Sequence, residues 1–352
     1  MKPRIAVIGA GAVGGYVGAG MAAAGHDVTL IDPWPEHVEA IRAGGMRLSG
    51  MTPEETRTVR VPTLHLTELQ RVARERPIDL AFVSVKSYDT EWAAAMIAPY
   101  LSPGGVVLSM QNCINEERIA SRLGWGRVLG VVVTGGLGLD LYEPAHIRRT
   151  MAKRPGQTCL YVGEPSGRVT ARAQAIAAIL GDVDEAHATD DLWGERWTKL
   201  CVNGMRNGVS AATGMGGNAR DTHDGVRRVC IRLGAESVRV GRALGFRVGR
   251  IGALDPDTLD RADSGDAAAM AEIERAMLRA SEGSARSDLQ RPSMAQDMAK
   301  GRRTEIDFMN GFIAAKGQEA GVAAPTHARL TEVVRRVERG ELRPDPSNVL
   351  WN

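Results

Sequence analysis

Three glycines near the N-terminus constrain the fold of this chain most strongly. Gly9, Gly11 and Gly14 form the pattern G-A-G-A-V-G between an apolar run at about residues 4–8 and a helical pattern at about residues 13–24. The first glycine permits a tight turn, the second lets a pyrophosphate approach the backbone, and the third lets the helix pack against the strand. The helix N-terminus then offers N–H groups to the phosphates. The predicted dinucleotide-binding loop consists of Gly9, Ala10, Gly11, Ala12, Val13 and Gly14.

The first half of the chain alternates short apolar runs with amphipathic segments, a pattern typical of βαβ units in a parallel sheet. We predict strands at about residues 4–8, 28–31, 80–85, 106–110 and 128–133, and helices at about 13–24, 35–43, 66–76, 91–98 and 115–123. Residues 47–66 alternate in character and predict a small antiparallel excursion, and T-C-L-Y-V-G-E at 158–164 predicts a strand at the far edge of the sheet.

The second half changes to helical spacing. Long helices are predicted at 192–209, 226–244, 267–281 and 304–319, with a loop at 252–268. A length of 352 residues also favours two domains. The predicted fold is an α/β Rossmann domain over residues 1–188 followed by an all-α domain over residues 189–352.

Composition excludes several classes of protein. The 44 basic and 42 acidic residues leave a net charge of +2, too small for the basic surface of a nucleic-acid-binding protein. The four cysteines form no C-x-x-C pair, and no His, Asp and Glu cluster has metal-ligand spacing, so we expect no metal and a reducing cytoplasm. The glycine density of residues 5–25 argues against a membrane span or a signal peptide.

Asp32 indicates which dinucleotide the loop binds. It follows Gly14 by 18 residues at the end of the second predicted strand, where a carboxylate can accept both ribose hydroxyls. No Arg or Lys within residues 32–37 could neutralise a 2′-phosphate, so we predict NAD rather than NADP. The alternative is that Asp32 only starts a turn and caps the next helix.

Lys86 and Asn112 follow two neighbouring strands of the predicted sheet. Open α/β sheets bind ligands beyond the carboxyl ends of their strands, so both side chains are candidates for cofactor binding, and Asn112 also for substrate binding. As alternatives, Lys86 is an ordinary surface lysine and Gln111-Asn112 caps the following helix.

Lys199, Asn203 and Asn207 have the spacing i, i+4, i+8 and would share one face of a helix. Asparagine is unfavourable inside helices, so two of them beside a lysine indicate a row that faces a ligand. The alternative is a solvated surface stripe.

Further polar candidates follow near the C-terminal end. Ser293 and Asp297 are spaced i, i+4, and Glu305 lies in the next amphipathic segment. A helix with solvated charges explains these residues equally well.

Taken in order, these motifs resemble the ketopantoate reductase family of 2-dehydropantoate 2-reductases and related 2-hydroxyacid dehydrogenases. The most specific parts are K-L-x-x-N-x-x-x-N from Lys199, and S-M-x-Q-D-M with T-E-I-D near the end. The resemblance implies a hydride transfer between a nicotinamide cofactor and a small 2-oxo or 2-hydroxy acid, with substrate between the two domains. Because of the small net charge and the glycine-rich residues 5–25, we expect no nucleic-acid or membrane partner, and a homodimer stays an open alternative.

The same resemblance implies roles for individual residues. Lys199 would be the general acid that protonates the carbonyl oxygen, and Glu305 would orient the substrate. The substrate-binding set would be Asn112, Asn203, Asn207, Ser293 and Asp297. An ammonium aimed at the carbonyl oxygen fits the negative charge that hydride arrival builds there.

The sequence departs from the family pattern at three places. Cys113 stands where the family commonly has Gly, Asp32 stands near the place of a basic residue that favours NADP, and the stretch 252–292 is longer than usual. Two alternatives remain open: an imine or 3-hydroxyacid oxidoreductase of similar architecture, and a dinucleotide-binding sensor without turnover.

Overall fold

The chain divides into two structural units. The computed structural model describes residues 2–282 and 291–351. Contacts within the chain separate Met1–Leu192 from Trp193–Asn352. The predicted boundary at residue 189 lies a few positions before this division.

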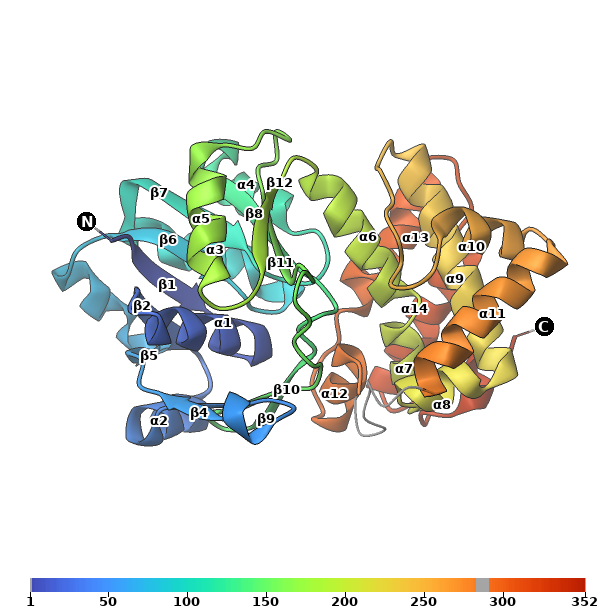
Figure 1. Ribbon diagram of the computed structural model, residues 1–352, viewed down its shortest axis with the longest axis horizontal. Coiled ribbons are helices and arrows are strands. Elements are labelled where there is room, and N and C mark those ends of the chain that lie inside the picture. Colours follow the sequence, from blue (N-terminus) through green and yellow to red (C-terminus); the bar gives the residue numbers. More distant parts are fainter. Residues whose placement is uncertain (1, 283–290, 352) are drawn as a thin grey trace. The chain divides into compact units, whose positions relative to one another are not determined.

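An eight-stranded sheet forms the centre of the first unit (Figure 1). Its strand order is β12-β11-β8-β7-β6-β1-β2-β5, and all neighbouring strands run parallel except β8 and β11. The strands are β1 Arg4–Ile8, β2 Asp27–Asp32, β5 Thr63–His65, β6 Ile78–Val83, β7 Leu101–Ser109, β8 Val128–Val133, β11 Leu160–Gly163 and β12 Ala186–Thr189. The predicted edge strand is therefore β11, but β12 lies outside it.

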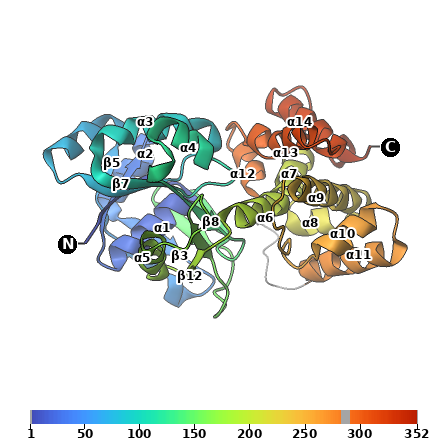
Figure 2. The same cartoon turned by 90° about the horizontal axis from the view of Figure 1, so that it is seen from above.

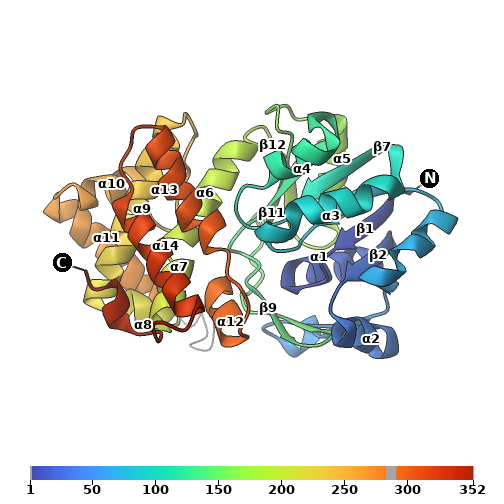
Figure 3. The ribbon, with the colours of Figure 1, turned by 180° about the vertical axis from the view of Figure 1, so that it is seen from behind.

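Helices cover both faces of this sheet, which is why its strands are continuously apolar. Figure 1 shows α1 and α5 on one face, Figure 3 shows α3 and α4 on the other, and Figure 2 shows the sheet between the two layers. Ile5 and Val7 of β1 pack in one core, whereas Ala6 and Ile8 pack in the other, as period-two alternation requires. The α-helices are α1 Ala12–Ala23, α2 Pro35–Gly44, α3 Thr90–Ile97, α4 Glu116–Leu123 and α5 Ala171–Gly181.

The predicted antiparallel excursion is confirmed in part. β3 and β4 pair antiparallel, but they belong to a second sheet of order β4-β3-β10-β9, and β5 joins the main sheet in parallel. The second sheet consists of β3 Met46–Ser49, β4 Arg57–Val59, β9 Leu139–Glu143 and β10 His146–Arg149. The helix predicted at 66–76 is the 3-10 helix η2 Leu66–Arg74. The other 3-10 helices of this unit have three residues each: η1 Pro53–Glu55, η3 Ser87–Asp89, η4 Ala98–Tyr100 and η5 Trp125–Arg127.

The second unit is helical throughout its described part. α9 is its central helix, since most of its residues are buried and it packs against α8, α10, α13 and α14. The helices are α6 Leu192–Gly204, α7 Asn207–Thr213, α8 Gly217–Thr222, α9 Asp224–Ala243, α10 Pro256–Asp263, α11 Ala267–Glu282, α12 Ser293–Ala299, η6 Ile306–Phe308, α13 Asn310–Glu319, α14 Pro325–Glu338 and η7 Pro346–Val349. The two units together confirm the predicted fold class.

Three expectations for the second unit were wrong. The helix predicted at 192–209 is two helices, and the one predicted at 304–319 starts only at Asn310, after a 3-10 turn. The loop predicted at 252–268 contains α10. Asp255 caps the start of this helix by accepting a hydrogen bond from the Thr258 N–H. That helix had a local signal, an N-cap aspartate followed by Pro256. The long stretch 252–292 also includes residues 283–290, which lie outside the described residues.

Candidate active site

The glycine-rich loop connects β1 to α1 and has the shape that a dinucleotide requires. Gly9 has φ +92, and a Cβ there would lie 2.9 Å from the Ser84 backbone. A Cβ on Gly14 would lie 2.0 Å from the Gly9 carbonyl oxygen, so α1 packs too closely for any side chain. A Cβ on Gly11 would instead meet open space, with nothing within 4 Å.

The start of α1 is suited to an anion. Gly11 is its N-cap and provides no side-chain cap, and the first turn, which contains the partly buried Ala12 and Val13, has no acidic residue. The first N–H groups of a helix have no intrahelical acceptor and carry partial positive charge. Loop and helix therefore fit the pyrophosphate of a dinucleotide.

Asp32 and His37 hold the middle of this loop. The Asp32 carboxylate accepts hydrogen bonds from the N–H of Ala10 at 2.7 Å and of Trp34 at 2.9 Å. His37 Nε2 lies 2.9 Å from the Ala10 carbonyl oxygen, and His37 Nδ1 lies 3.0 Å from the Ala145 nitrogen. Because a backbone N–H can only donate, Nδ1 carries no proton and Nε2–H donates to Ala10. Both backbone groups of Ala10 are thus held by side chains.

Asp32 starts a turn, as the alternative interpretation predicted, but it does not cap α2, whose N-cap residue is Trp34 and has no side-chain cap. Its bond to Trp34 makes a turn at the end of β2, and its bond to Ala10 places the carboxylate against the cofactor loop. Each oxygen accepts one of these bonds and retains capacity to accept another.

Lys86 and Asn112 lie at the same edge of the sheet as the glycine-rich loop. They follow β6 and β7, and β6 lies between β1 and β7, so the carboxyl ends of all three strands meet at this edge. Gln111 connects the two loops, donating to the Val85 carbonyl at 2.9 Å and to Thr90 Oγ1 at 2.8 Å.

Gln111-Asn112 does not cap the following helix. Asn115 is the N-cap residue of α4, and it makes no side-chain cap. Cys113 is buried with φ +65, a left-handed conformation that favours glycine. That conformation gives a physical reason for the glycine common in the family at this position.

Lys199 is the chemically distinctive residue of the second unit. It lies on α6 and is partly buried. Burial, and then the positive charges of Arg206 and Arg196, lower the pKa of its ammonium group to about 8. A lysine with this pKa can donate and accept a proton near neutral pH.

Lys199, Asn203 and Asn207 do not share one helix, contrary to the prediction. α6 ends at Gly204, so only Lys199 and Asn203 keep the i, i+4 relation. Asn207 is the first residue of α7, after the break at Met205 and Arg206. Asn203 and Asn207 are both nearly buried, which does not fit a solvated surface stripe.

The remaining predicted residues reach the same part of the second unit on other elements. Ser293 begins α12, and the buried Asp297 lies one turn later; α12 packs against α7, the helix that Asn207 begins. Glu305 is 3% exposed and directly precedes η6. A Cβ on Gly208, next to Asn207, would lie 3.1 Å from Cδ1 of Ile306, the residue after Glu305.

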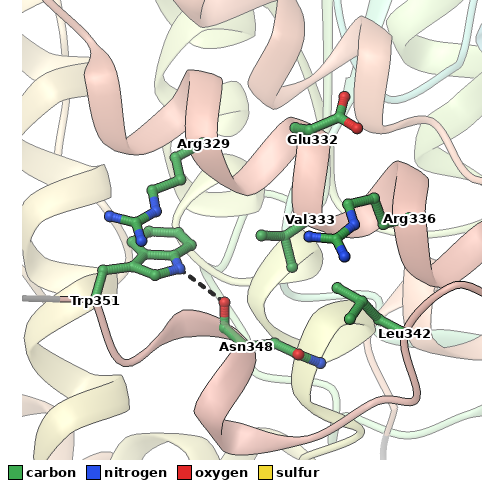
Figure 4. Close-up of a pocket in the computed structure, with 7 residues that line it drawn as sticks. All are labelled: Arg329, Glu332, Val333, Arg336, Leu342, Asn348 and Trp351. Atoms are coloured by element: carbon green, nitrogen blue, oxygen red, sulfur yellow. Dashed lines mark hydrogen bonds between the residues drawn. The ribbon is translucent and has the colours of Figure 1, made fainter.

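A hollow of about 340 Å³ lies elsewhere in the second unit, between α14 and the C-terminal segment (Figure 4). Arg329 stacks on the Trp351 ring there, with its guanidinium carbon 4.8 Å from the ring centre. The lining residues are Arg329, Glu332, Val333, Arg336, Leu342, Asn348 and Trp351. None of them is a predicted site residue.

Within residues 2–282 and 291–351, no group of three His, Cys, Asp or Glu side chains could hold a metal ion. In the same ranges, no helix has the length and apolar character needed to cross a membrane.

Comparison with known proteins places the chain in a family. The ketopantoate reductase PanE/ApbA model matches residues 5–164, and the model of the C-terminal part of the same family matches residues 191–338. The chain belongs to the ketopantoate reductase family. The resemblance inferred from the motifs is thus confirmed.

Individual relatives extend over nearly the whole chain. A 2-dehydropantoate 2-reductase of Archaeoglobus fulgidus is 31% identical over 340 residues, which cover 96% of this chain and 98% of the relative. A ketopantoate reductase structure from Ralstonia eutropha has a TM-score of 0.75 at 30% identity, and the match covers 96% of this chain and 99% of that structure's chain. A D-mandelate dehydrogenase structure has a TM-score of 0.77 at 23% identity. The match covers 96% of this chain and 98% of that structure's chain, and it shows a shared fold.

As a ketopantoate reductase family member, the protein is an oxidoreductase that transfers a hydride between a nicotinamide cofactor and a C=O or CH–OH group of a 2-oxo or 2-hydroxy acid. The matches do not favour an imine or 3-hydroxyacid oxidoreductase, or a sensor without turnover.

Sequence reasoning missed three buried residues that hold these regions in place. They are His37 at the cofactor loop, and Asn310 and His327 behind the α6–α7 break. For Asn310 a signal existed, because the pair Asn310-Gly311 stands in the middle of a predicted helix, where neither residue is favourable. For the histidines only their partners reveal the role.

Proposed function

We propose that this protein is an NAD-dependent reductase of 2-oxo acids in which Lys199 supplies the proton. The observation that carries the proposal is the Lys199 ammonium, whose pKa is lowered to about 8, one helical turn before the nearly buried Asn203. When bound, the nicotinamide supplies the hydride. Lys199 stabilises the negative charge that develops on the carbonyl oxygen and then donates its proton to that oxygen.

The other polar residues of the second unit bind and orient the acid in this proposal. Asn203, Asn207 and Ser293 hold its hydroxyl or carboxylate, and Asp297 lies on the same short helix as Ser293. Glu305 orients the substrate. In the first unit, Lys86 and Asn112 border the nicotinamide at the sheet edge that carries the glycine-rich loop.

NAD is proposed over NADP because of the surroundings of Asp32. Its carboxylate is fixed against Ala10, where a 2′-phosphate would meet like charge. Arg42 on α2 is paired with Glu39 and Glu68, which neutralise it. A carboxylate that bonds two ribose hydroxyls leaves room for a preference of about tenfold or more.

The substrate class is tested with NADH oxidation against a panel of 2-oxo acids that begins with 2-dehydropantoate. Turnover of at least one 2-oxo acid, with kcat/KM higher for NADH than for NADPH, is expected. If no member of the panel is turned over, the proposed reaction is refuted. If kcat/KM is equal with NADH and NADPH, the proposed role of Asp32 is refuted.

Two matched variants isolate the cofactor preference. Asp32→Ser should reduce the ratio of kcat/KM with NADH to kcat/KM with NADPH, because it removes the fixed negative charge. Asp27→Ser, at the other end of the same strand, removes an exposed carboxylate that pairs with Arg76 and should leave the ratio unchanged.

The cell compartment and the oligomer are further proposals. All four cysteines are buried free thiols, which supports the cytoplasm, where thiols stay reduced. A homodimer remains a prediction that sedimentation would test.

A further inference from the structure

The break between α6 and α7 is held by a side chain from a distant part of the chain. α6 ends at Gly204, directly after Asn203, and α7 begins at Asn207. The last carbonyls of a helix have no intrahelical donor and need another partner. The Gly204 carbonyl accepts a hydrogen bond of 2.8 Å from the side-chain amide of Asn310, which lies 106 residues later.

Asn310 also contacts the second helix of the break. A Cβ added to Gly208 would lie 3.0 Å from Asn310 Oδ1, so α7 packs directly against the amide. On the other side, a Cβ on Gly204 would lie 2.8 Å from Ile313 Cδ1 and 3.3 Å from His327 Cε1. Both helices therefore approach Asn310 and His327 at glycines, where no side chain intervenes.

His327 sets the orientation of the Asn310 amide. Its Nδ1 lies 3.0 Å from Asn310 Nδ2, and its Nε2 lies 2.9 Å from the Leu233 carbonyl oxygen. Because a carbonyl can only accept, Nε2 carries the proton, and the unprotonated Nδ1 accepts from the amide. Turning the amide over would point Oδ1 at the Gly204 oxygen and remove both bonds. Asn310 and His327 are fully buried.

The pair is anchored in the central helix. Ser237 of α9 lies 2.9 Å from His327 Nε2, and its carbonyl accepts a hydrogen bond of 2.9 Å from the Trp197 indole on α6. Glu236 accepts from the backbone N–H of His327. These bonds connect the α6–α7 break to α9, the central helix of the unit.

We propose that Asn310, oriented by His327, is a positioning residue that ends α6 at Gly204 and so sets where Asn203 and Asn207 present their amides to the substrate. Asn310 touches no reacting atom in this role. It also begins α13, just after the turn that follows Glu305, and so it connects the asparagines to the segment that carries Glu305. The inference rests on the proposed function, whose reaction supplies the readout.

The test uses two substitutions at Asn310 that keep its size. Asn310→Asp replaces the donor to Gly204 with an acceptor, and Asn310→Leu removes all hydrogen bonding. In both, KM for the best 2-oxo acid should rise about tenfold and kcat should fall, the usual effect of losing one or two buried bonds. The Kd for NADH should stay within about twofold, because the cofactor loop belongs to the other unit.

Substitutions at His327 separate positioning from simple loss of packing. Asn at this position can present Oδ1 near the place of Nδ1 and accept from Asn310, whereas Leu cannot. His327→Asn should therefore retain KM within about threefold of wild type, while His327→Leu should resemble Asn310→Leu.

Two more variants keep the inference testable if those substitutions prevent folding. Gly208→Ala would place a methyl group 3.0 Å from Asn310 Oδ1 without deleting any bond, and should raise KM. Thr326→Val is the control, because Thr326 is buried and its backbone N–H and hydroxyl both donate to Glu236 of α9 rather than to α6 or α7. It should lower Tm and leave KM unchanged.

The outcomes are distinguishable. If the Asn310 variants lose only Tm and keep wild-type KM and kcat, as Thr326→Val should, the inference is refuted while the proposed function stands. If wild-type protein binds NADH but reduces no 2-oxo acid, the proposed function fails instead. Equal KM values for His327→Asn and His327→Leu would also overturn the role of His327.

Discussion

The glycine-rich loop and the α6–α7 break are both irregular stretches of backbone supported by a buried histidine, yet the side chains that bond to their backbone lie at very different separations in the sequence. His37 holds Ala10 across 27 residues, and its neighbour Asp32 holds the same residue across 22. At the break, Asn310 reaches back 106 residues to Gly204. In both places the histidine is fully buried and accepts at Nδ1.

This difference separates two ways of building a site. The side chains that bond to the backbone of the loop come from one βαβ unit, so its glycines and Asp32 follow a spacing that local sequence reveals, although His37 itself accepts from the Ala145 N–H 108 residues later. The break contacts α13 and α14 through Asn310 and His327, and locally only the pairs Asn203-Gly204 and Asn207-Gly208 mark it. Perturbing each region in turn should therefore affect different steps, cofactor binding for the loop and acid turnover for the break.

Lys199→Ala should produce the largest effect and separate the two regions most clearly. Loss of one positioned acid should lower kcat by about 100-fold or more, with the NADH Kd unchanged. Glu305→Ala should raise KM as well as lower kcat, and the double variant should lose less than the two single losses combined. Lys316→Ala, which removes a surface lysine paired with Glu319, is the matched control.

The pH profile checks the same residue. With the pKa of Lys199 lowered to about 8, reduction should decline above that pH as the ammonium loses its proton. Oxidation of the 2-hydroxy acid needs the neutral amine and should rise over the same range. A Lys199→Ala enzyme with near wild-type kcat would remove this mechanism.

The second prediction concerns acid stability at the break. Burial lowers the pKa of His327 from 6.5 to about 4. Between these pH values the imidazole is protonated in the unfolded chain but neutral in the folded protein. Stability that His327 contributes at neutral pH is therefore lost as pH falls from about 6.5 to about 4. Chemical unfolding at pH 7 and pH 4.5 should show wild type losing about 2 to 3 kcal/mol more than His327→Asn. Parallel losses in both proteins would contradict it.

His37 offers a smaller test at the loop. His37→Leu removes the bonds to Ala10 and Ala145 and should weaken NADH binding about tenfold, measured by fluorescence titration. His37→Gln can still donate to the Ala10 carbonyl and should recover most of the affinity. His187→Leu replaces an exposed histidine of the same unit and should change nothing. KM for the acid should not respond to any of the three.

The smallest effect is expected at Cys113. Cys113→Gly relieves a φ of +65 but removes a buried side chain, so the unfolding free energy should change by less than about 1 kcal/mol. Which 2-oxo acids are accepted should change. Among the described residues, Ala145 is the other non-glycine residue with positive φ. Ala145→Gly should leave the set of accepted 2-oxo acids unchanged. Loss of all activity in a folded, NADH-binding Cys113→Gly protein would indicate a chemical role instead.

Two helices of the second unit, α10 and α13, differ from their predictions for different physical reasons. α10 was missed although Asp255 and Pro256 mark its start locally, because the acidic, proline-containing segment was interpreted as a loop. The helix predicted at 304–319 starts later because a 3-10 turn at Ile306–Phe308 precedes α13, and the amide of Asn310, its first residue, bonds to the distant Gly204 and to His327.

The sequence by itself determined the glycine-rich loop, the parallel strands around it and the residue types of the site. Buried strands and phosphate loops carry period-two apolar patterns and fixed glycine spacings that arise within short stretches of chain. The tertiary structure decided that α6 stops at Gly204 and that Asn207 begins a new helix, where the sequence offers only the weak local signal of the pair Asn203-Gly204. A helix continues as long as each carbonyl finds a donor four residues ahead, and the Gly204 carbonyl accepts from a side chain that the sequence places 106 residues away.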